Sequence, residues 1–164
     1  GSEMCIRDRE KIMKIDFEIK RLTEKYTADV AKIENKCFSR PWNETAISAE
    51  LENEFSRFYI AVCGGSAVGY VGIYVLTGEA DIVRVAVLPE FRENGIARAV
   101  LKKALDEADC DVFLDVRESN APAIALYKSL GFYDTGVRKN YYSMPTENAV
   151  LMKRDKPCEG GTQK

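Results

Sequence analysis

VRVAVLPEFRENGIAR, residues 83 to 98, is the stretch that decides the fold. Its β-branched start predicts a strand, which Pro89 ends. The chain then turns through Gly95 into a helix-forming run from Ala97 to Ala108. A strand that leads through a glycine-containing loop into a helix exposes unpaired backbone N–H groups at the positive end of the helix dipole. The junction therefore predicts an anion site that is well suited to phosphate.

A second strand–loop–helix unit follows in LDVRESNAPAIALYKSLGF, residues 114 to 132. Val112 to Val116 has the composition of a short buried strand. Asn120 is a preferred N-cap residue, and Pro122 falls in the first helical turn, where its missing N–H costs little. Gly131 is placed to end the helix.

Motifs in these two segments resemble the GCN5-related N-acetyltransferase (GNAT) superfamily. Arg92-x-x-Gly95-x-Ala97 is similar to the loop that holds the pyrophosphate of acetyl-coenzyme A (acetyl-CoA) in that superfamily. The pattern Asn-x-x-Ala-x-x-Leu-Tyr-x-x-x-Gly-Phe, residues 120 to 132, is similar to the next helix of the same proteins. The chain most resembles the bacterial RimI-type enzymes, which acetylate the N-terminal alanine of a small-subunit ribosomal protein. The further segments that carry this resemblance are Arg40–Glu44, Leu114–Asn120, Arg138–Tyr142 and Asn148–Met152.

The resemblance implies an α/β (α+β) acyl-CoA N-acyltransferase fold, with a mixed central sheet of about seven strands and about four helices. Local patterns predict the matching order of strand, two helices, three strands, helix, strand, helix and two strands. In the first helix, Ala28, Ala31, Ile33 and Cys37 are expected on the apolar face. The predicted ranges are Ile15–Leu22, Ala28–Phe38, Asn43–Glu52, Phe58–Cys63, Ala67–Leu76, Ala80–Leu88, a helix after Gly95, Val112–Val116, a helix after Asn120, Phe132–Asn140 and Ala149–Lys153.

The pattern predicts a single folded domain with extensions at both ends. Residues 1–12 have no period and are interpreted as a tag or extraneous segment, with the natural start at Met13. Residues 13–154 are predicted to form the N-acetyltransferase domain. Residues 155–164 are polar and are predicted to be a disordered tail.

Composition excludes several classes of protein. The net charge of −2 argues against direct binding to nucleic acid, and no apolar run reaches the ~18 residues that span a membrane. The absence of histidine and the wide spacing of the five cysteines argue against a metal site and against a Ser-His or Cys-His catalytic pair. We expect a cytoplasmic protein without a metal, in which carboxylates, tyrosine or water carry any acid–base chemistry.

Acetyl transfer from a thioester requires a neutral amine. The α-amine of a protein N-terminus has a pKa near ~7.7–8.0, so a weak base suffices. The resemblance implies that Asp115 is this base, although the family usually has glutamate there, so the shorter aspartate would act through a water molecule. The alternative is a strand-end carboxylate that caps a loop or pairs with Arg117 or Arg84. Asp81 is the second candidate base, and a solvated strand-end charge is its alternative.

Tyr127 lies seven residues after Asn120, which places both side chains on one helix face. The resemblance implies that Tyr127 protonates the CoA thiolate. A phenol with a pKa near ~10 keeps its proton at neutral pH and can give it to a thiolate with a pKa near ~8.5. The alternative is a core tyrosine beside Ile124 and Leu130.

The resemblance also implies two binding surfaces. The negative charge of Glu93 is unfavourable beside a pyrophosphate, and the positive charges of Arg92 and Arg98 would offset this repulsion. The acceptor peptide is expected between Pro41-Trp42 and Tyr141-Tyr142, with core packing as the alternative for these aromatic residues. The residues predicted to bind acetyl-CoA are Val85, Ala86, Val87, Arg92, Glu93, Asn94, Gly95, Ile96, Ala97, Arg98, Asn120 and Tyr127.

Three functions remain open at this point. The first is acetylation of the α-amine of a protein N-terminus, the N-terminal alanine of a small-subunit ribosomal protein, by direct attack without a covalent enzyme intermediate. The second is acetylation of a small amine such as a polyamine or an antibiotic. The third is a non-catalytic acyl-CoA-binding partner subunit. In that case, aspartate at position 115 in place of the family's glutamate would reflect the loss of catalytic activity.

Overall fold

The computed structural model of this protein describes residues 15–158. The predicted extraneous segment, the start at Met13 and the end of the predicted tail lie outside the described residues. The helices and strands are β1 Glu18–Arg21, α2 Thr27–Cys37, α3 Glu44–Glu50, β2 Ser56–Cys63, β3 Ser66–Leu76, β4 Glu79–Val87, α4 Ile96–Ala108, β5 Asp111–Arg117, α5 Ala121–Ser129, β6 Tyr133–Tyr142 and β7 Glu147–Arg154. Short 3₁₀ turns at Glu24–Tyr26 and Pro89–Phe91 were not predicted.

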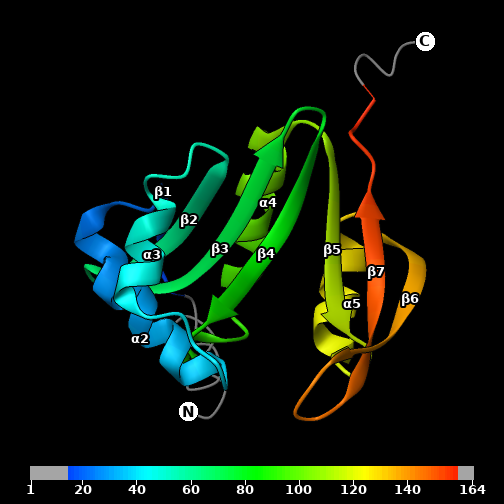
Figure 1. Cartoon of the computed structure of the whole chain (residues 1–164). Coiled ribbons are helices and arrows are strands. Elements are labelled where there is room, and N and C mark those ends of the chain that lie inside the picture. Colours follow the sequence, from blue (N-terminus) through cyan, green and yellow to red (C-terminus); the bar gives the residue numbers. More distant parts are fainter. Residues whose placement is uncertain (1–14, 159–164) are drawn as a thin grey trace, which may run out of the picture.

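These strands form one seven-stranded sheet in the order β1-β2-β3-β4-β5-β7-β6. All neighbours are antiparallel except β4 and β5, which are parallel. Figure 1 shows α2 and α3 on the near face of the sheet, and α4 and α5 behind it. The predicted mixed sheet and the predicted element order are thus confirmed.

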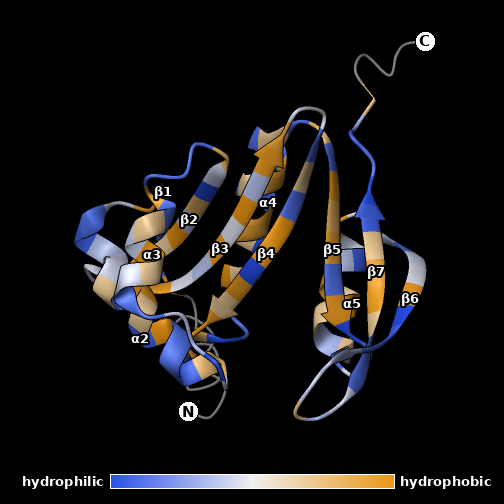
Figure 2. Ribbon diagram, viewed as in Figure 1, coloured by the Kyte–Doolittle hydropathy of each residue, from blue (hydrophilic) through white to orange (hydrophobic). Residues whose placement is uncertain are grey.

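Two apolar cores cover the two faces of the sheet, because side chains of a strand alternate between its faces. In β2, Phe58 and Ile60 point to the core under α2 and α3, whereas Tyr59 and Ala61 point to the core under α4. Figure 2 shows the apolar residues that run along β2 and β3 between these helices. The central strands are therefore buried on both faces.

Local sequence signals position the helices as predicted. The Asn43 side chain accepts a hydrogen bond from the Ala46 N–H, and the Asn120 side chain accepts one from the Ala123 N–H. One prediction about α2 is wrong: Ala28 is exposed, and Glu34 lies on the buried face instead. The predicted face was rotated because Val30, which is fully buried, was left out of the apolar pattern.

The β4 strand contains an irregularity that matters for the site. Gly72 pairs with Arg84 but the adjacent Ile73 pairs with Ile82, so Val83 is an extra residue in β4. A bulge of this kind shifts the following side chains to the opposite face. As a result, Arg84 lies on the α2 side of the sheet, although Ile82 contacts the core under α4.

Close packing at Gly72 gives a prediction about stability. A Cβ at Gly72 would lie 2.5 Å from Cζ of Phe58, whose ring stacks on Tyr70 and is 4% exposed. We expect Gly72→Ala to lower the free energy of unfolding by about 1–3 kcal/mol, as overpacking does. Gly136→Ala is the matched control, because its Cβ would meet only Leu151, at 3.8 Å. Urea denaturation of both variants checks this, and equal midpoints would contradict it.

Candidate active site

A cleft opens where β4 and β5 separate. The two strands pair only from Glu79↔Asp111 to Asp81↔Phe113, and beyond these positions they diverge. The cleft between them has a volume of about 770 Å³. It is lined by Cys37, Phe38, Ser39, Arg40, Ile82, Val83, Arg84, Val85, Leu114, Asp115, Val116, Arg117, Asn120, Tyr127, Tyr141, Tyr142, Ser143 and Met144.

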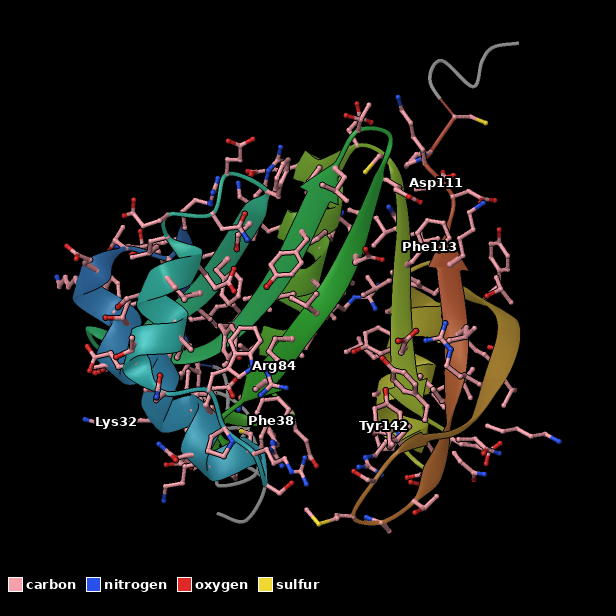
Figure 3. All side chains as sticks on the ribbon, in the orientation of Figure 1. Lys32, Phe38, Arg84, Asp111, Phe113 and Tyr142 are labelled. Atoms are coloured by element: carbon pink, nitrogen blue, oxygen red, sulfur yellow. The ribbon has the colours of Figure 1, made fainter. Side chains whose placement is uncertain are left out.

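The cleft has two walls. Figure 3 shows Phe38 and Arg84 on one side of the opening and Tyr142 on the other. The first wall consists of β4 and the segment that follows α2, and the second consists of β5, α5 and the β6–β7 loop. The structure thus brings predicted residues from both catalytic and binding groups into one cavity.

Asp115 is an exposed carboxylate on β5 that faces this cleft. Its side chain has no ion pair or hydrogen bond within residues 15–158. The two arginines considered as partners are engaged elsewhere, since Arg117 pairs with Glu147 and Arg84 pairs with Glu34. The alternative structural role through either arginine is therefore wrong, and the carboxylate is available to a ligand.

Tyr127 reaches the cleft from α5 and is only 8% exposed. Its ring packs edge-on against Phe132, with centroids 5.7 Å apart, so the residue belongs to the core and to the cleft at once. Burial, and secondarily the nearby Tyr142, raises the pKa of the Tyr127 phenol to about 12. The hydroxyl has no hydrogen-bond partner among residues 15–158.

Asp81 lies at the last paired position of β4, just above the opening. It is not among the residues that line the cleft. Burial, and then the charges of Glu79 and Asp115, raise the pKa of its carboxyl. Asp81 therefore senses the charge of Asp115, whereas Asp115 itself shares the cavity with Tyr127 and Asn120.

A buried ion pair beneath the first wall was not predicted from the sequence. Glu34 is fully buried and binds Arg84, with 2.8 Å between Oε1 and Nη2. It also accepts hydrogen bonds from the Trp42 N–H at 2.8 Å and from the Tyr70 hydroxyl. The sequence contained a signal, because Glu34 lies four residues after Val30 on the same helix face as this apolar residue.

A second arginine fixes the other wall. Arg117 pairs with Glu147 at 3.1 Å and donates to the carbonyl oxygens of Ser143 and Pro145. Its guanidinium lies 4.6 Å from the ring centroid of Tyr142. These contacts hold the β6–β7 loop against β5. Burial, and then the charge of Asp115, raises the pKa of Tyr142 to about 12, so this phenol stays neutral beside the carboxylate.

The predicted groove residues divide into two groups. Tyr141 and Tyr142 line the cleft, with ring centroids 5.0 Å apart. Pro41 and Trp42 do not line it: Pro41 is exposed, and the Trp42 ring lies behind the cleft wall, 4.7 Å from the Arg84 guanidinium. On this side of the opening the wall is formed by Phe38 and Arg40 instead.

The predicted anion site lies at the other end of β4. Gly95 is the N-cap of α4, with φ of +78°, and no Cβ contact would occur there within 4 Å. Within residues 15–158, the backbone N–H groups of residues 93 to 98 have no hydrogen-bond acceptor. Free N–H groups at a helix N-terminus suit a phosphate. Glu93 is exposed in the left-handed region, with φ of +65°.

Side chains of the same junction hold its shape. Arg92 donates to the Val87 carbonyl at 3.0 Å, and Arg98 donates to Ser129 of α5 at 2.6 Å. Val85 lines the cleft, whereas Ala86 packs in the core under α2 and Val87 in the core under α4. An extended ligand could therefore place an anion at the junction and its other end between β4 and β5.

Comparison with known proteins agrees with this arrangement. Residues 27–132 match the model of the acetyltransferase (GNAT) family. The chain is 34% identical over 128 residues to the ribosomal protein bS18-alanine N-acetyltransferase of Escherichia coli K12, covering 73% of this chain and 84% of that protein. It is 37% identical over 120 residues to the N-alpha-acetyltransferase RimI of Mycobacterium tuberculosis, covering 70% and 76% of the two chains.

The structure resembles a solved relative as well. The crystal structure of the ribosomal-protein-S18-alanine N-acetyltransferase from Escherichia coli superposes with a TM-score of 0.81 at 28% identity, over 91% of this chain and 99% of that one. The fold, the diverging strands and the free N–H groups at Gly95 are thus accompanied by sequence identity over most of the chain. The protein belongs to the GNAT family and is an acetyl-CoA-dependent N-acetyltransferase of the RimI type.

Proposed function

We propose that this protein transfers the acetyl group of acetyl-CoA to the α-amine of an N-terminal alanine of a small-subunit ribosomal protein, in the bacterial cytoplasm. Residues 13–154 form the catalytic domain. The observation that carries the proposal is the Asp115 carboxylate, which has no ion pair or hydrogen bond in the described part of the chain and shares the cleft with the buried phenol of Tyr127. The name of the Escherichia coli relative supports an N-terminal alanine of a ribosomal protein as the acceptor, and the name of the Mycobacterium tuberculosis relative supports an α-amine.

The chemistry matches an α-amine. About a tenth or more of such amines are neutral at pH 7, so Asp115 needs only to accept a proton through a water molecule. The neutral amine attacks the thioester carbonyl directly, and no covalent enzyme intermediate forms. Tyr127, which stays protonated because burial raises its pKa to about 12, donates a hydrogen bond to the departing thiolate. Acetyl-CoA supplies the activated acetyl group.

The same geometry supports a proposed binding mode for acetyl-CoA. The pyrophosphate binds the free N–H groups of residues 93 to 98, and Arg92 and Arg98 stand beside it. The pantetheine arm runs along Val85 to Val87, beyond the positions at which β4 pairs with β5. The far end of the arm lies next to Asn120 and Tyr127, because both residues line the cleft from the N-cap and body of α5. The acceptor enters from the opposite side, between Phe38 and Tyr142.

The direct test is mass spectrometry of an Ala-starting ribosomal peptide incubated with the protein and acetyl-CoA. We expect one acetyl group on the α-amine of alanine and none on lysine side chains, whose pKa near ~10.4 keeps them charged. A peptide with a blocked N-terminus is the control. Acetylation of polyamines or antibiotics in preference to the peptide would contradict the proposal, and binding of acetyl-CoA without any transfer would point to a non-catalytic subunit.

The pyrophosphate site gives a prediction about affinity. Gly95→Asp has room for its side chain, and we expect the new carboxylate to weaken acetyl-CoA binding at least about tenfold by repulsion of the phosphates. Gly78→Asp is the matched control, because Gly78 also has a positive φ and open space but lies in the β3–β4 turn. Calorimetry at low and high salt measures the effect, which salt should reduce. Equal affinities of the two variants for acetyl-CoA would show that the junction at Gly95 is not part of the binding site.

A further inference from the structure

The guanidinium of Arg84 is held rigidly at the surface of the cleft. Its Nε and Nη2 atoms bind the two carboxylate oxygens of Glu34, at 3.2 and 2.8 Å. The ring centroids of Phe38 and Trp42 lie 4.1 and 4.7 Å from its central carbon. A planar guanidinium that is paired on one edge and flanked by aromatic rings loses little further freedom when it binds a ligand.

One nitrogen of this guanidinium remains available. Nη2 also donates to the Arg40 carbonyl at 3.3 Å, but Nη1 has no acceptor within residues 15–158. The Arg84 side chain is 20% exposed and lines the cleft. It lies on the wall opposite Tyr142, as Figure 3 shows, and Tyr142 senses the charge of Asp115. Arg84 therefore lines the cleft on the wall opposite Tyr142, with the Nη1 donors not used by any acceptor among residues 15–158.

The buried carboxylate of Glu34 balances the positive charge of Arg84. Glu34 is fully buried, and the Trp42 N–H and the Tyr70 hydroxyl fix its carboxylate. A neutralised pair presents N–H donors without a net positive charge, which would otherwise repel a protonated amine. Such donors suit a neutral acceptor atom such as a peptide carbonyl oxygen.

We propose that Arg84 Nη1 donates a hydrogen bond to the carbonyl oxygen of the first residue of the acceptor, while the α-amine of that residue faces Asp115. In a peptide, the carbonyl carbon of the first residue is bonded directly to the Cα atom that bears the α-amine. Arg84 is thus a specificity-determining residue that favours peptide N-termini over simple amines, which lack the carbonyl. The inference rests on the proposed function and specifies how the acceptor is recognised.

The test compares two acceptors, an Ala-starting peptide and its analogue in which an (E)-alkene replaces the first peptide bond. Because a lone Glu34 would be a buried unpaired charge, the comparison is made between Glu34→Gln and Glu34→Gln/Arg84→Met. Glutamine keeps an oxygen for the Trp42 N–H, and methionine keeps an apolar stem between the aromatic rings. In Glu34→Gln we expect the alkene to lower kcat/KM by about 10- to 100-fold, the range for hydrogen bonds to charged groups.

In the double variant, the ratio of kcat/KM for the two acceptors should shrink at least about tenfold, because the donor is gone. A merely structural role of Arg84 would lower kcat/KM for both acceptors alike. The affinity for acetyl-CoA, measured by calorimetry, should be the same in both variants. Arg84→Lys in the wild-type background provides a second route, since it keeps the pair with Glu34 but loses the free Nη1 donors.

Two outcomes overturn the inference in different ways. If the carbonyl matters equally with and without the Arg84 side chain, while the wild-type protein acetylates the peptide, the inference fails and the proposed function stands. If the wild-type protein prefers small amines to the peptide, the proposed function fails and the inference fails with it.

Discussion

Tyr127→Phe should lower kcat by about 10²- to 10³-fold, the range for losing one hydrogen-bond donor to a charge that develops in the transition state. Burial raises the pKa of this phenol to about 12, so it is a weaker acid than a free thiol and acts by a hydrogen bond that strengthens as the thiolate develops. The ring is retained in the variant, so its packing on Phe132 and the affinity for acetyl-CoA should change little.

The measurement is a single-turnover rate, which reports the chemical step. Because the pKa lies at about 12, Tyr127 stays protonated in the wild-type protein, and the loss should be the same at every pH between about 6 and 9. Tyr59→Phe is the matched control: its pKa is also raised to about 12 by burial, but its hydroxyl binds Glu107, away from the cleft. Wild-type turnover in Tyr127→Phe would reduce this residue to a packing role.

Asp115→Asn should reduce kcat/KM by about 10²-fold at about pH 6, where few α-amines are neutral, and the loss should shrink as the pH passes the amine pKa near ~8. Asp115→Glu should be tolerated or faster, because the longer side chain reaches the amine more directly. The measurement is the pH profile of kcat/KM for the Ala-starting peptide.

Asp81→Asn in the same assay tests the rival base. The charge of Asp115 is one cause of the raised pKa of Asp81, after burial and Glu79, so Asp115→Asn should lower that pKa. A base must be ionised to act. If Asp81 were the base, the acidic limb of the profile would therefore move to lower pH in Asp115→Asn, and Asp81→Asn would show the large loss. Loss in neither variant would mean that the enzyme acts mainly by positioning an amine that arrives neutral.

Local signals explain why much of the molecule could be predicted. Gly95 and Asn120 mark helix starts through backbone conformation and capping, which depend on a few neighbouring residues. The spacing between Asn120 and Tyr127 fixes a shared helix face, and both residues do line the cleft. The resemblance to a known family added that these strands form one mixed central sheet, which alternation alone leaves open.

Other features depend on contacts between distant segments. The extra residue at Val83 leaves no mark in the apolar pattern, yet it decides that Arg84 meets Glu34, fifty residues earlier in the chain. Trp42 was expected in the groove, but its ring packs against the Arg84 guanidinium and does not line the cleft. These positions depend on contacts between side chains that are distant in the sequence. The periodicity of apolar residues contains no information about such contacts.

The sequence by itself determined the element order, the capped helices and the strand–loop–helix junction at Gly95, because each arises from residues close together in the chain. Only the tertiary structure decided that Asp115 has no ion pair or hydrogen bond with the rest of residues 15–158. That result required Arg117 to be held by Glu147 and Arg84 by Glu34, and both pairs join segments far apart in sequence. Pairing of these two arginines with other carboxylates leaves Asp115 available to a substrate, and such pairing is a property of the folded molecule.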